Sequence, residues 1–339
     1  MLWALVLLSG CERQTPAQQL TGMTMGTTWQ VTYLPVAGAP ERAAVQQLIV
    51  AQLDAVNESM STYREDSEIS RFSAAPVDVA LSVSQEFLEV LQAALAVGER
   101  SRGAYDVTLA PLVELWGFGP AEPLNEPPAH QRIVDVLAQT GQAALQVDRS
   151  ALTVTKLAPR SLDFSSLAKG YAVDRVALAL EAAGIGRYLV EVGGEMRVAG
   201  LSHRDDLWRV AIEQPDAASR AVARTIELTD AAIATSGDYR NFVEFNGQRY
   251  SHPIDPRTGY PVRHDLVSVT VVHPSAMLAD AWATALLVLG AQEAGQVARR
   301  HHLAAYFIRR QGEAMQHTFT EDFSRYIGEN GHRQAGDAL

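Results

Sequence analysis

Two short segments of the sequence combine residue types that could do chemistry on a phosphorylated substrate. Residues 251–259 (SHPIDPRTG) combine His252, Asp255 and a guanidinium with two prolines, which stiffen the backbone. Asp280 and Thr284 are four residues apart, so in a helix both side chains would lie on one face and could meet a single cation. These two ligands would need substrate phosphates and water to complete a magnesium shell. The pattern predicts metal-assisted chemistry on a phosphate group, although each group taken alone also fits a turn network or a polar helix face.

A third polar cluster occupies residues 162–170 (LDFSSLAKG), where a long helix is expected to begin. Asp163 or Ser165 could cap that helix. The unpaired N–H groups and the dipole of a helix N-terminus favour anions. Asp163, Ser166 and Lys169 could therefore serve a phosphate, a metal or the edge of a heterocycle. An ordinary capped helix with a solvated lysine is the alternative.

Helices and hairpins must position these residues. Apolar residues at helical spacing predict helices over residues 40–59, 84–102 and 275–289, a shorter one near 130–139, and one that runs from the capping segment to residue 183. Strands are predicted over 28–34, 144–148, 152–156, 188–192, 196–199, 243–245, 248–250, 266–272 and 304–309. Gly193-Gly194 and Asn246-Gly247 mark two hairpin turns. The sequence lacks strict βαβ alternation, a G-x-G-x-x-G after a strand and a Walker loop. We therefore expect an α+β fold with mixed or antiparallel sheets and flanking helices, and not a Rossmann fold.

Composition and the N-terminus indicate the class of protein. The chain has 339 residues, is 47% apolar and carries a net charge of −11, which argues against a nucleic-acid partner. Its single cysteine, Cys11, follows an apolar run too short to span a bilayer, and LSGC resembles a bacterial lipobox. We expect a signal peptide over 1–10, a lipidated flexible tether over 11–22, one domain over 23–327 and a disordered tail over 328–339. An uncleaved apolar N-terminus with an incidental cysteine is the alternative.

Nine short segments, in order along nearly the whole mature chain, resemble the ApbE family of FAD:protein FMN transferases. They are 24–27 (TMGT), 61–63 (STY), 103–106 (GAYD), 111–119 (PLVELWGFG), 163–170 (DFSSLAKG), 188–194 (YLVEVGG), 235–240 (TSGDYR), 251–259 (SHPIDPRTG) and 279–284 (ADAWAT). Each segment is modest by itself, and their shared order makes the resemblance specific. Members of the family are commonly envelope lipoproteins, which agrees with the N-terminus.

The resemblance implies an ApbE-like fold over residues 23–327 and a defined set of site residues. The substrate FAD would be bound by Met25, Tyr63, Ala104, Tyr105, Asp106, Asp163, Lys169 and Ile254. A magnesium ion would be held by Ser166, Asp280, Ala283 and Thr284. Some relatives carry an acidic residue at position 283, where alanine offers only its backbone carbonyl. The residue at position 169 also varies within the family.

The resemblance further implies the reaction and its setting. FMN would pass from FAD to a threonine or serine hydroxyl of an acceptor subunit of an envelope redox complex, with release of AMP. An imidazole, whose unperturbed pKa is about 6.5, suits removal of the hydroxyl proton. We expect His252 to act as this base and Asp255 to orient it. Hydrolysis of FAD to FMN and AMP, or storage of FAD without turnover, are the alternatives. The expected location is the periplasm-facing bacterial envelope, with a lipid anchor in the inner membrane.

Overall fold

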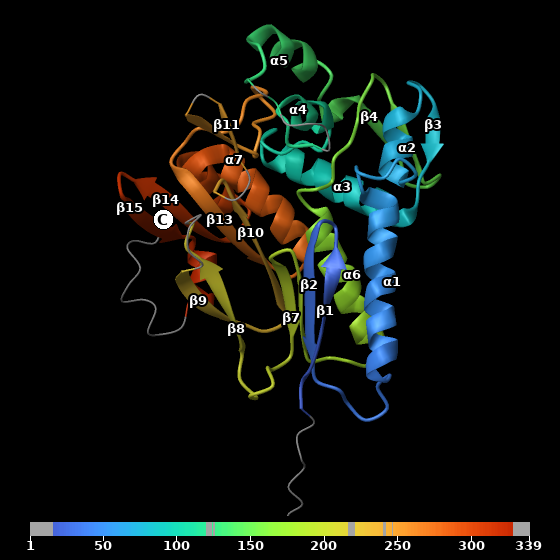
Figure 1. The fold of residues 1–339 in the computed structure, drawn as a ribbon, viewed down its shortest axis with the longest axis vertical. Helices are drawn as coiled ribbons and strands as arrows, with labels where there is room; N and C mark the ends of the chain where they lie inside the picture. The colour runs from blue at the N-terminus through green and yellow to red at the C-terminus, as the bar shows by residue number, and fades with distance from the viewer. Residues whose placement is uncertain are drawn as a thin grey trace, which may run out of the picture.

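The computed structural model describes residues 16–119, 124, 126–215, 221–239, 242–245 and 247–327, and an eight-stranded antiparallel sheet forms its centre (Figure 1). The strand order is β1-β2-β6-β7-β10-β13-β14-β15. These strands are β1 (Gln18–Thr24), β2 (Thr27–Tyr33), β6 (Tyr188–Val192), β7 (Glu195–Ala199), β10 (Ala231–Gly237), β13 (Leu266–His273), β14 (Ala304–Gln311) and β15 (Ala314–Phe319). The fold is therefore α+β and not doubly wound, as the sequence predicted.

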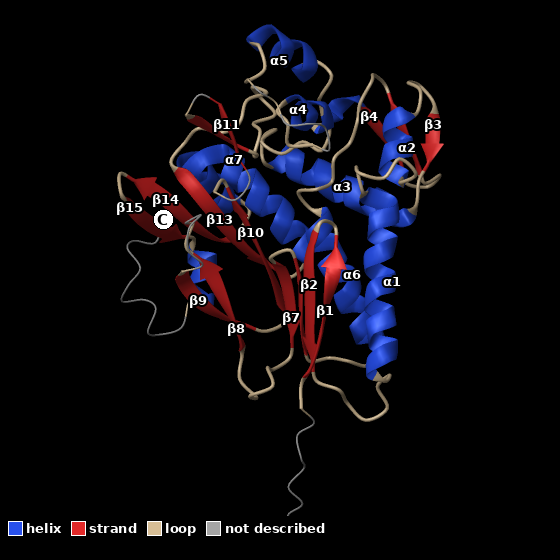
Figure 2. Cartoon of the chain, viewed as in Figure 1, coloured by secondary structure: helices blue, strands red, loops and turns tan. Residues whose placement is uncertain are grey.

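Helices cover one face of this sheet, and three small sheets are separate from it (Figure 2). The helices are α1 (Arg42–Met60), α2 (Glu68–Ala74), α3 (Gln85–Arg100), α4 (Ala110–Leu115), α5 (His130–Leu137), α6 (Ala168–Ala182) and α7 (Ala276–Arg300), with 3₁₀ turns η1 (Gln142–Ala144) and η2 (Glu321–Tyr326). The small sheets are β3 (Ala80–Ser82) with β5 (Thr153–Lys156) and β4 (Leu145–Asp148), β8 (Trp208–Glu213) with β9 (Val222–Leu228), and β11 (Phe242–Phe245) with β12 (Gln248–Ser251). Within the described part of the chain, no helix is long and apolar enough to cross a membrane.

The sheet separates two hydrophobic clusters. Alternate residues of β14 show this directly, because Ala305 and Phe307 join the cluster under the helices while Tyr306 and Ile308 join the cluster near β8, β9 and η2. A third cluster lies around Trp116, between α4, α5 and the β11–β12 hairpin. The helix α6 is buried on most sides. Such a helix must pack among other elements, and α6 contacts α1, α7 and β6.

Several expectations about the elements need correction. Residues 18–22 belong to β1, which pairs with β2, so a flexible tether over 11–22 is wrong for that part. The helix α6 begins at Ala168 after Leu167, without a side-chain cap, so neither Asp163 nor Ser165 caps it. The helix expected to end at 289 continues to residue 300, although Gly290 departs from helical geometry with φ 73°.

Both predicted hairpins are present, in the pairings β6–β7 and β11–β12. Asn246, Cys11, the proposed signal peptide and the tail over 328–339 lie outside the described residues. The pattern missed β1, β3, β8, β9, β10, β15, α2 and α4. The sequence of β10 (AAIATSG) is alanine-rich, and alanine is depleted in strands. Small side chains are nevertheless needed there because β10 packs directly against α7.

Candidate active site at the crossing of α6 and α7

The helices α6 and α7 meet in close backbone contact at Gly170. A Cβ atom added at this position would lie 2.3 Å from the carbonyl oxygen of Ala276, so the crossing requires glycine. The Gly170 N–H donates a hydrogen bond to Oδ2 of Asp280 at 3.2 Å. The crossing therefore holds the Asp280 carboxylate against the first turn of α6, where backbone N–H groups have no partner within the helix.

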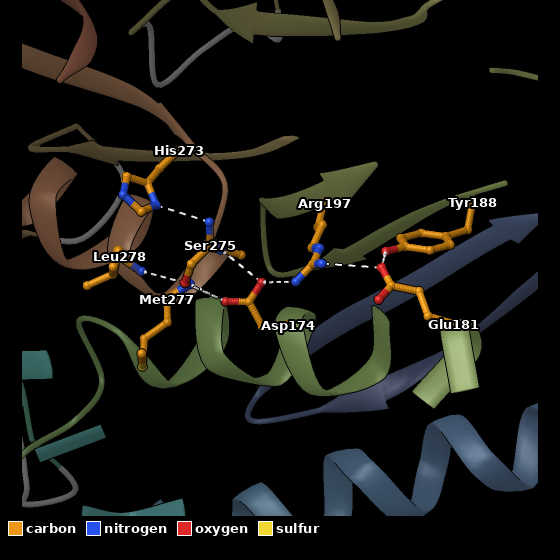
Figure 3. A network of polar contacts seen from close by, with 9 residues as sticks. Asp174, Glu181, Tyr188, Arg197, His273, Ser275, Met277 and Leu278 are labelled. Atoms are coloured by element: carbon orange, nitrogen blue, oxygen red, sulfur yellow. Dashed lines mark hydrogen bonds and ion pairs between the residues drawn. The ribbon is translucent and has the colours of Figure 1, made fainter. Parts of the chain in front are cut away.

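A second contact between the same helices fixes the start of α7 (Figure 3). Asp174 of α6 accepts hydrogen bonds from the Ser275 hydroxyl at 2.7 Å and from the next two backbone N–H groups of α7, both at 3.0 Å. Arg197 of β7 donates to the same carboxylate at 3.0 Å and bridges to Glu181 at 3.2 Å. A carboxylate at a helix N-terminus satisfies free N–H groups and interacts favourably with the helix dipole. Asp174 thereby determines where α7 begins and where Asp280 lies.

The Asp280 carboxylate shares its surroundings with one lysine and one further carboxylate. Asp280 is 3% exposed and Glu195, the first residue of β7, is 4% exposed. Nζ of Lys169 lies 2.8 Å from Oε1 of Glu195 and 3.8 Å from Oδ2 of Asp280. Burial raises the pKa of Asp280, Lys169 opposes this rise and Glu195 adds to it. Burial acts to lower the pKa of Lys169, but the charges of Asp280 and Glu195 outweigh it and raise that pKa. The three groups carry one excess negative charge when all are ionised.

The hydroxyl of Ser166 comes from the turn before α6, three residues before Lys169. It shares a hydrogen bond with the phenol of Tyr105 at 2.8 Å. Burial raises the pKa of Tyr105, and the nearby charge of Asp280 raises it further. The phenol therefore stays protonated and links Ser166 to the neighbourhood of Asp280. Ala104 is 1% exposed, so only its backbone can offer a contact to a ligand.

Two acidic residues expected at the flavin shape the backbone in this structure. Oδ1 of Asp163 accepts a hydrogen bond from the Ser165 N–H at 2.7 Å, which closes the turn before α6. Oδ1 of Asp106 accepts from both the N–H and the hydroxyl of Thr108, and Oδ2 accepts from the Gln142 N–H. Both residues are close in sequence to the Tyr105–Ser166 pair, and both are half-buried.

The predicted pair on α7 is positioned as its spacing suggested. Asp280 and Thr284 are separated by one helical turn, and the hydroxyl of Thr284 shares a hydrogen bond with that of Ser236, on β10, at 3.0 Å. The side chain of Ala283 is fully buried, so its backbone carbonyl is the group it can offer. Carboxylate, hydroxyl and carbonyl oxygens are hard donors of the kind that magnesium takes. Glu195 lies nearby, but its Oε1 is ion-paired to Lys169 and its Oε2 is buried without a hydrogen-bond partner. The donor set therefore fits a magnesium ion.

Among the described residues, no group of three or more His, Cys, Asp or Glu side chains could hold a metal by itself. Any metal here must rely on hydroxyl and carbonyl oxygens and on oxygens from a substrate or from water. This requirement matches a site in which substrate phosphates complete the shell.

The turn between β1 and β2 borders the same cluster. Met25 occupies this turn with φ 48°. Thr27, two residues later, lies close to Gly193 and to the stem of Lys169. A Cβ atom added at Gly193 would be 2.9 Å from Thr27 and 3.0 Å from Lys169. Asn57 of α1 donates to the Thr24 hydroxyl at 3.0 Å and so ties the turn to that helix. Tyr63 follows the end of α1 and is 72% exposed. Its aromatic face is free to stack on a planar ring.

The loop that follows β12 carries the predicted base. His252 is half-buried, and its ring centre lies 6.4 Å from that of Phe118 in an edge-to-face arrangement. Asp255 does not orient His252, because all the side-chain hydrogen bonds that its carboxylate makes in the described structure come from Arg257, at 2.9 to 3.2 Å. This ion pair closes the loop, so the orienting role predicted for Asp255 is wrong. Ile254 is 4% exposed within the Trp116 cluster, which leaves mainly its backbone for ligand contact.

Three residues of this arrangement were missed from the sequence. Glu195 directly follows the Gly193-Gly194 turn, and a charged residue at the start of a buried strand could have drawn attention to it. Ser236 lies within the segment 235–240 that resembles the family, but nothing local indicates that it meets α7. Asp174 interrupts the apolar stripe of α6 and is 7% exposed, which identifies it as a buried acid only once the fold is known.

Fold and site together define an α+β enzyme with a buried carboxylate, a lysine and hydroxyls gathered around the crossing of α6 and α7. A sequence model of the ApbE family matches residues 25–307. The chain is 40% identical over 338 residues to the FAD:protein FMN transferase of Klebsiella pneumoniae (strain 342), covering 96% of both chains. It is 37% identical over 338 residues to that of Escherichia coli (strain K12), again covering 96% of each. The chain therefore belongs to the ApbE family.

Solved structures give the same relationship. The flavin transferase ApbE from Vibrio cholerae superimposes with a TM-score of 0.86 at 40% identity, over 92% of this chain and all of that one. The ApbE protein from Thermotoga maritima gives a TM-score of 0.82 at 28% identity, over 93% of this chain and all of that one. The expected ApbE-like fold is thus confirmed.

Proposed function

We propose that this chain, a FAD:protein FMN transferase, uses a magnesium ion bound at Asp280 to transfer FMN to a threonine or serine hydroxyl of its acceptor. Membership of the ApbE family and the named relatives support transfer of FMN from FAD to an acceptor protein as its activity, with FAD as the substrate. The observation that carries the metal-assisted form is the buried Asp280 carboxylate, one turn from Thr284 and beside Lys169.

Ser166, Asp280, Thr284 and the carbonyl of Ala283 would hold the metal. A bound magnesium ion would offset the negative charge of the pyrophosphate and the charge that develops on the leaving AMP. The ammonium of Lys169 provides a further positive charge in the same buried space. In this low-dielectric environment each of these charges interacts with phosphate more strongly than it would in water.

The reaction replaces the phosphoanhydride bond of FAD with a phosphoester bond to the acceptor. The acceptor hydroxyl oxygen forms a bond to the FMN-side phosphorus of FAD, and the bond from that phosphorus to the bridging oxygen breaks. The electron pair of the broken bond leaves with AMP. The hydroxyl proton passes to the imidazole of His252, and such a base contributes roughly a hundred- to ten-thousand-fold. Positioning and charge must provide the remainder of the acceleration.

The FAD contacts follow from the same arrangement. Met25, in the β1–β2 turn, and the exposed ring of Tyr63 would flank the isoalloxazine. Asp106, Asp163 and the backbone at Ala104, Tyr105 and Ile254 would offer polar contacts. The ammonium of Lys169 is the group in this set best suited to a phosphate oxygen.

The test is an incubation of the purified chain with FAD, magnesium and a threonine-bearing acceptor domain of a membrane flavoprotein, followed by intact mass of the acceptor. We expect a gain of one FMN unit with release of AMP, and loss of both in Asp280→Ala. The control variant Asp54→Ala removes an exposed carboxylate of α1 and should retain full transfer. Free FMN and AMP with unmodified acceptor would instead indicate hydrolysis. Unchanged bound FAD would indicate storage.

We also propose that the chain is anchored in the bacterial envelope through a lipid on Cys11 and modifies acceptor subunits of envelope redox complexes. The lipobox-like sequence LSGC, at residues 8–11, supports this location. Membrane fractionation checks it, because Cys11→Ala should move the protein from the membrane to the soluble fraction. Equal membrane association of both forms would reject the lipid anchor.

A further inference from the structure

The Lys169 ammonium has two carboxylates within reach but contacts only one of them closely. Its Nζ lies 2.8 Å from Glu195 and 3.8 Å from Asp280. Both carboxylates are almost completely buried. Oε2 of Glu195 has no partner at all, although it belongs to the residue that binds the lysine. The lysine is therefore held on the Glu195 side of the site.

The β6–β7 hairpin fixes this position through two contacts. Gly193 has φ 63°, and a Cβ atom there would come within 3.0 Å of Cδ of Lys169, so the turn lies directly against the lysine stem. Glu195 starts β7 two residues later and binds the head of the same side chain. A rigid hairpin thus determines both the path of the stem and the place of the charge.

This position matters because an ammonium and a divalent cation compete for the same carboxylate oxygen. A metal ligand must be deprotonated and free of a tight ion pair. By Coulomb's law at the effective dielectric constant of a partly buried site, moving Lys169 from 3.8 to 2.8 Å from Asp280 changes an equilibrium constant roughly tenfold. A lysine released from Glu195 would make that move, since Asp280 is the other buried carboxylate beside it.

We propose that Glu195 is a positioning residue that holds the ammonium of Lys169 away from Asp280 and so keeps the Asp280 carboxylate free for a divalent cation. The inference rests on the proposed metal-assisted function. It explains why a lysine can remain in the site for the substrate phosphates without displacing the metal. It also gives the buried Glu195, which has no place among the FAD and metal contacts, a function in the same site.

The test measures binding of Mn²⁺, used as a spectroscopic probe, to the full chain without FAD. Free Mn²⁺ is followed by electron paramagnetic resonance in the wild type, Glu195→Gln, Lys169→Met and the double variant. Glu195→Gln should raise the dissociation constant about tenfold. In the Lys169→Met background the same substitution should change it by about twofold at most, because the competing ammonium is gone. Thermal unfolding of each variant confirms that it is folded, and Glu195→Asp, which keeps the charge, should remain close to the wild type.

The outcomes distinguish the positioning role of Glu195 from a direct effect of Glu195 on the metal, and both from the absence of a metal site. Equal weakening by Glu195→Gln in both backgrounds would overturn the inference, since Glu195 would then act on the metal directly. Mn²⁺ binding that is unchanged in Glu195→Gln would also overturn it while leaving the metal proposal intact. Absence of Mn²⁺ binding in the wild type, both without FAD and after FAD is added, would refute the metal site itself and this inference with it.

Discussion

Replacing Gly170 with alanine perturbs the crossing of α6 and α7 at its tightest point. The new Cβ would lie 2.3 Å from the carbonyl oxygen and 2.6 Å from the carbonyl carbon of Ala276, whereas ordinary contact begins near 3.4 Å. The clash is with backbone, which cannot rotate away, so the helices must separate by about 1 Å. Overpacking of this kind costs about 1–3 kcal/mol, which exceeds the gain of up to about 1 kcal/mol that alanine brings to a helix.

The same displacement should reduce catalysis. Asp280 accepts a hydrogen bond from the Gly170 N–H, and separating the helices stretches this bond and shifts the carboxylate. A misplacement of about 1 Å can cost roughly a hundredfold in rate. We therefore expect Gly170→Ala to lower the free energy of unfolding by about 2 kcal/mol and the rate of FMN transfer by about a hundredfold.

Urea unfolding and a single-turnover transfer assay measure the two effects. The matched control is Gly186→Ala, because a Cβ there meets nothing within 4 Å and the backbone is not left-handed. This control should keep full transfer activity and a stability within about 1 kcal/mol of the wild type. If Gly170→Ala behaved like the control in both assays, the close crossing would not be what positions Asp280.

Three further predictions follow from single contacts. Asp174→Ala should lower the free energy of unfolding by about 3 kcal/mol in urea, because Arg197 and the N-terminus of α7 lose a buried acceptor; a change below about 1 kcal/mol would contradict this. Trp116→Phe should cost about 2 kcal/mol in the same assay, since the indole N–H donates to the carbonyl of Gly259 at 2.9 Å in a buried position. Burial lowers the pKa of His273 below its usual 6.5, and the unfolded chain therefore binds that proton more readily. Stability should then fall as pH drops below about 6.5, and unfolding at pH 7.5 and 5.5 should show a smaller fall in His273→Gln.

Local patterns were sufficient for much of the fold. The apolar stripe of α1, the hairpin glycines and the alternating residues of β2 each specify an element through contacts between near neighbours, and all three elements formed as predicted. The strand β10 was missed because its small residues are required by packing against α7. The sequence of the strand itself gives no sign of that contact. The start of α6 was misplaced for a related reason, since Asp163 caps a separate turn before that helix.

The amino-acid sequence by itself determined the ApbE resemblance, the α+β class and the Asp280–Thr284 pair, whose spacing depends only on helix geometry. Tertiary structure alone decided which charges meet. The Gly170–Asp280 hydrogen bond joins residues 110 positions apart, and the contact of Asp174 with the start of α7 spans 102. Asp255 accepts hydrogen bonds from Arg257, two residues away, although the same stretch of sequence had suggested a contact with His252. Such pairings depend on how helices and strands pack against one another, and local sequence propensities carry no information about that packing.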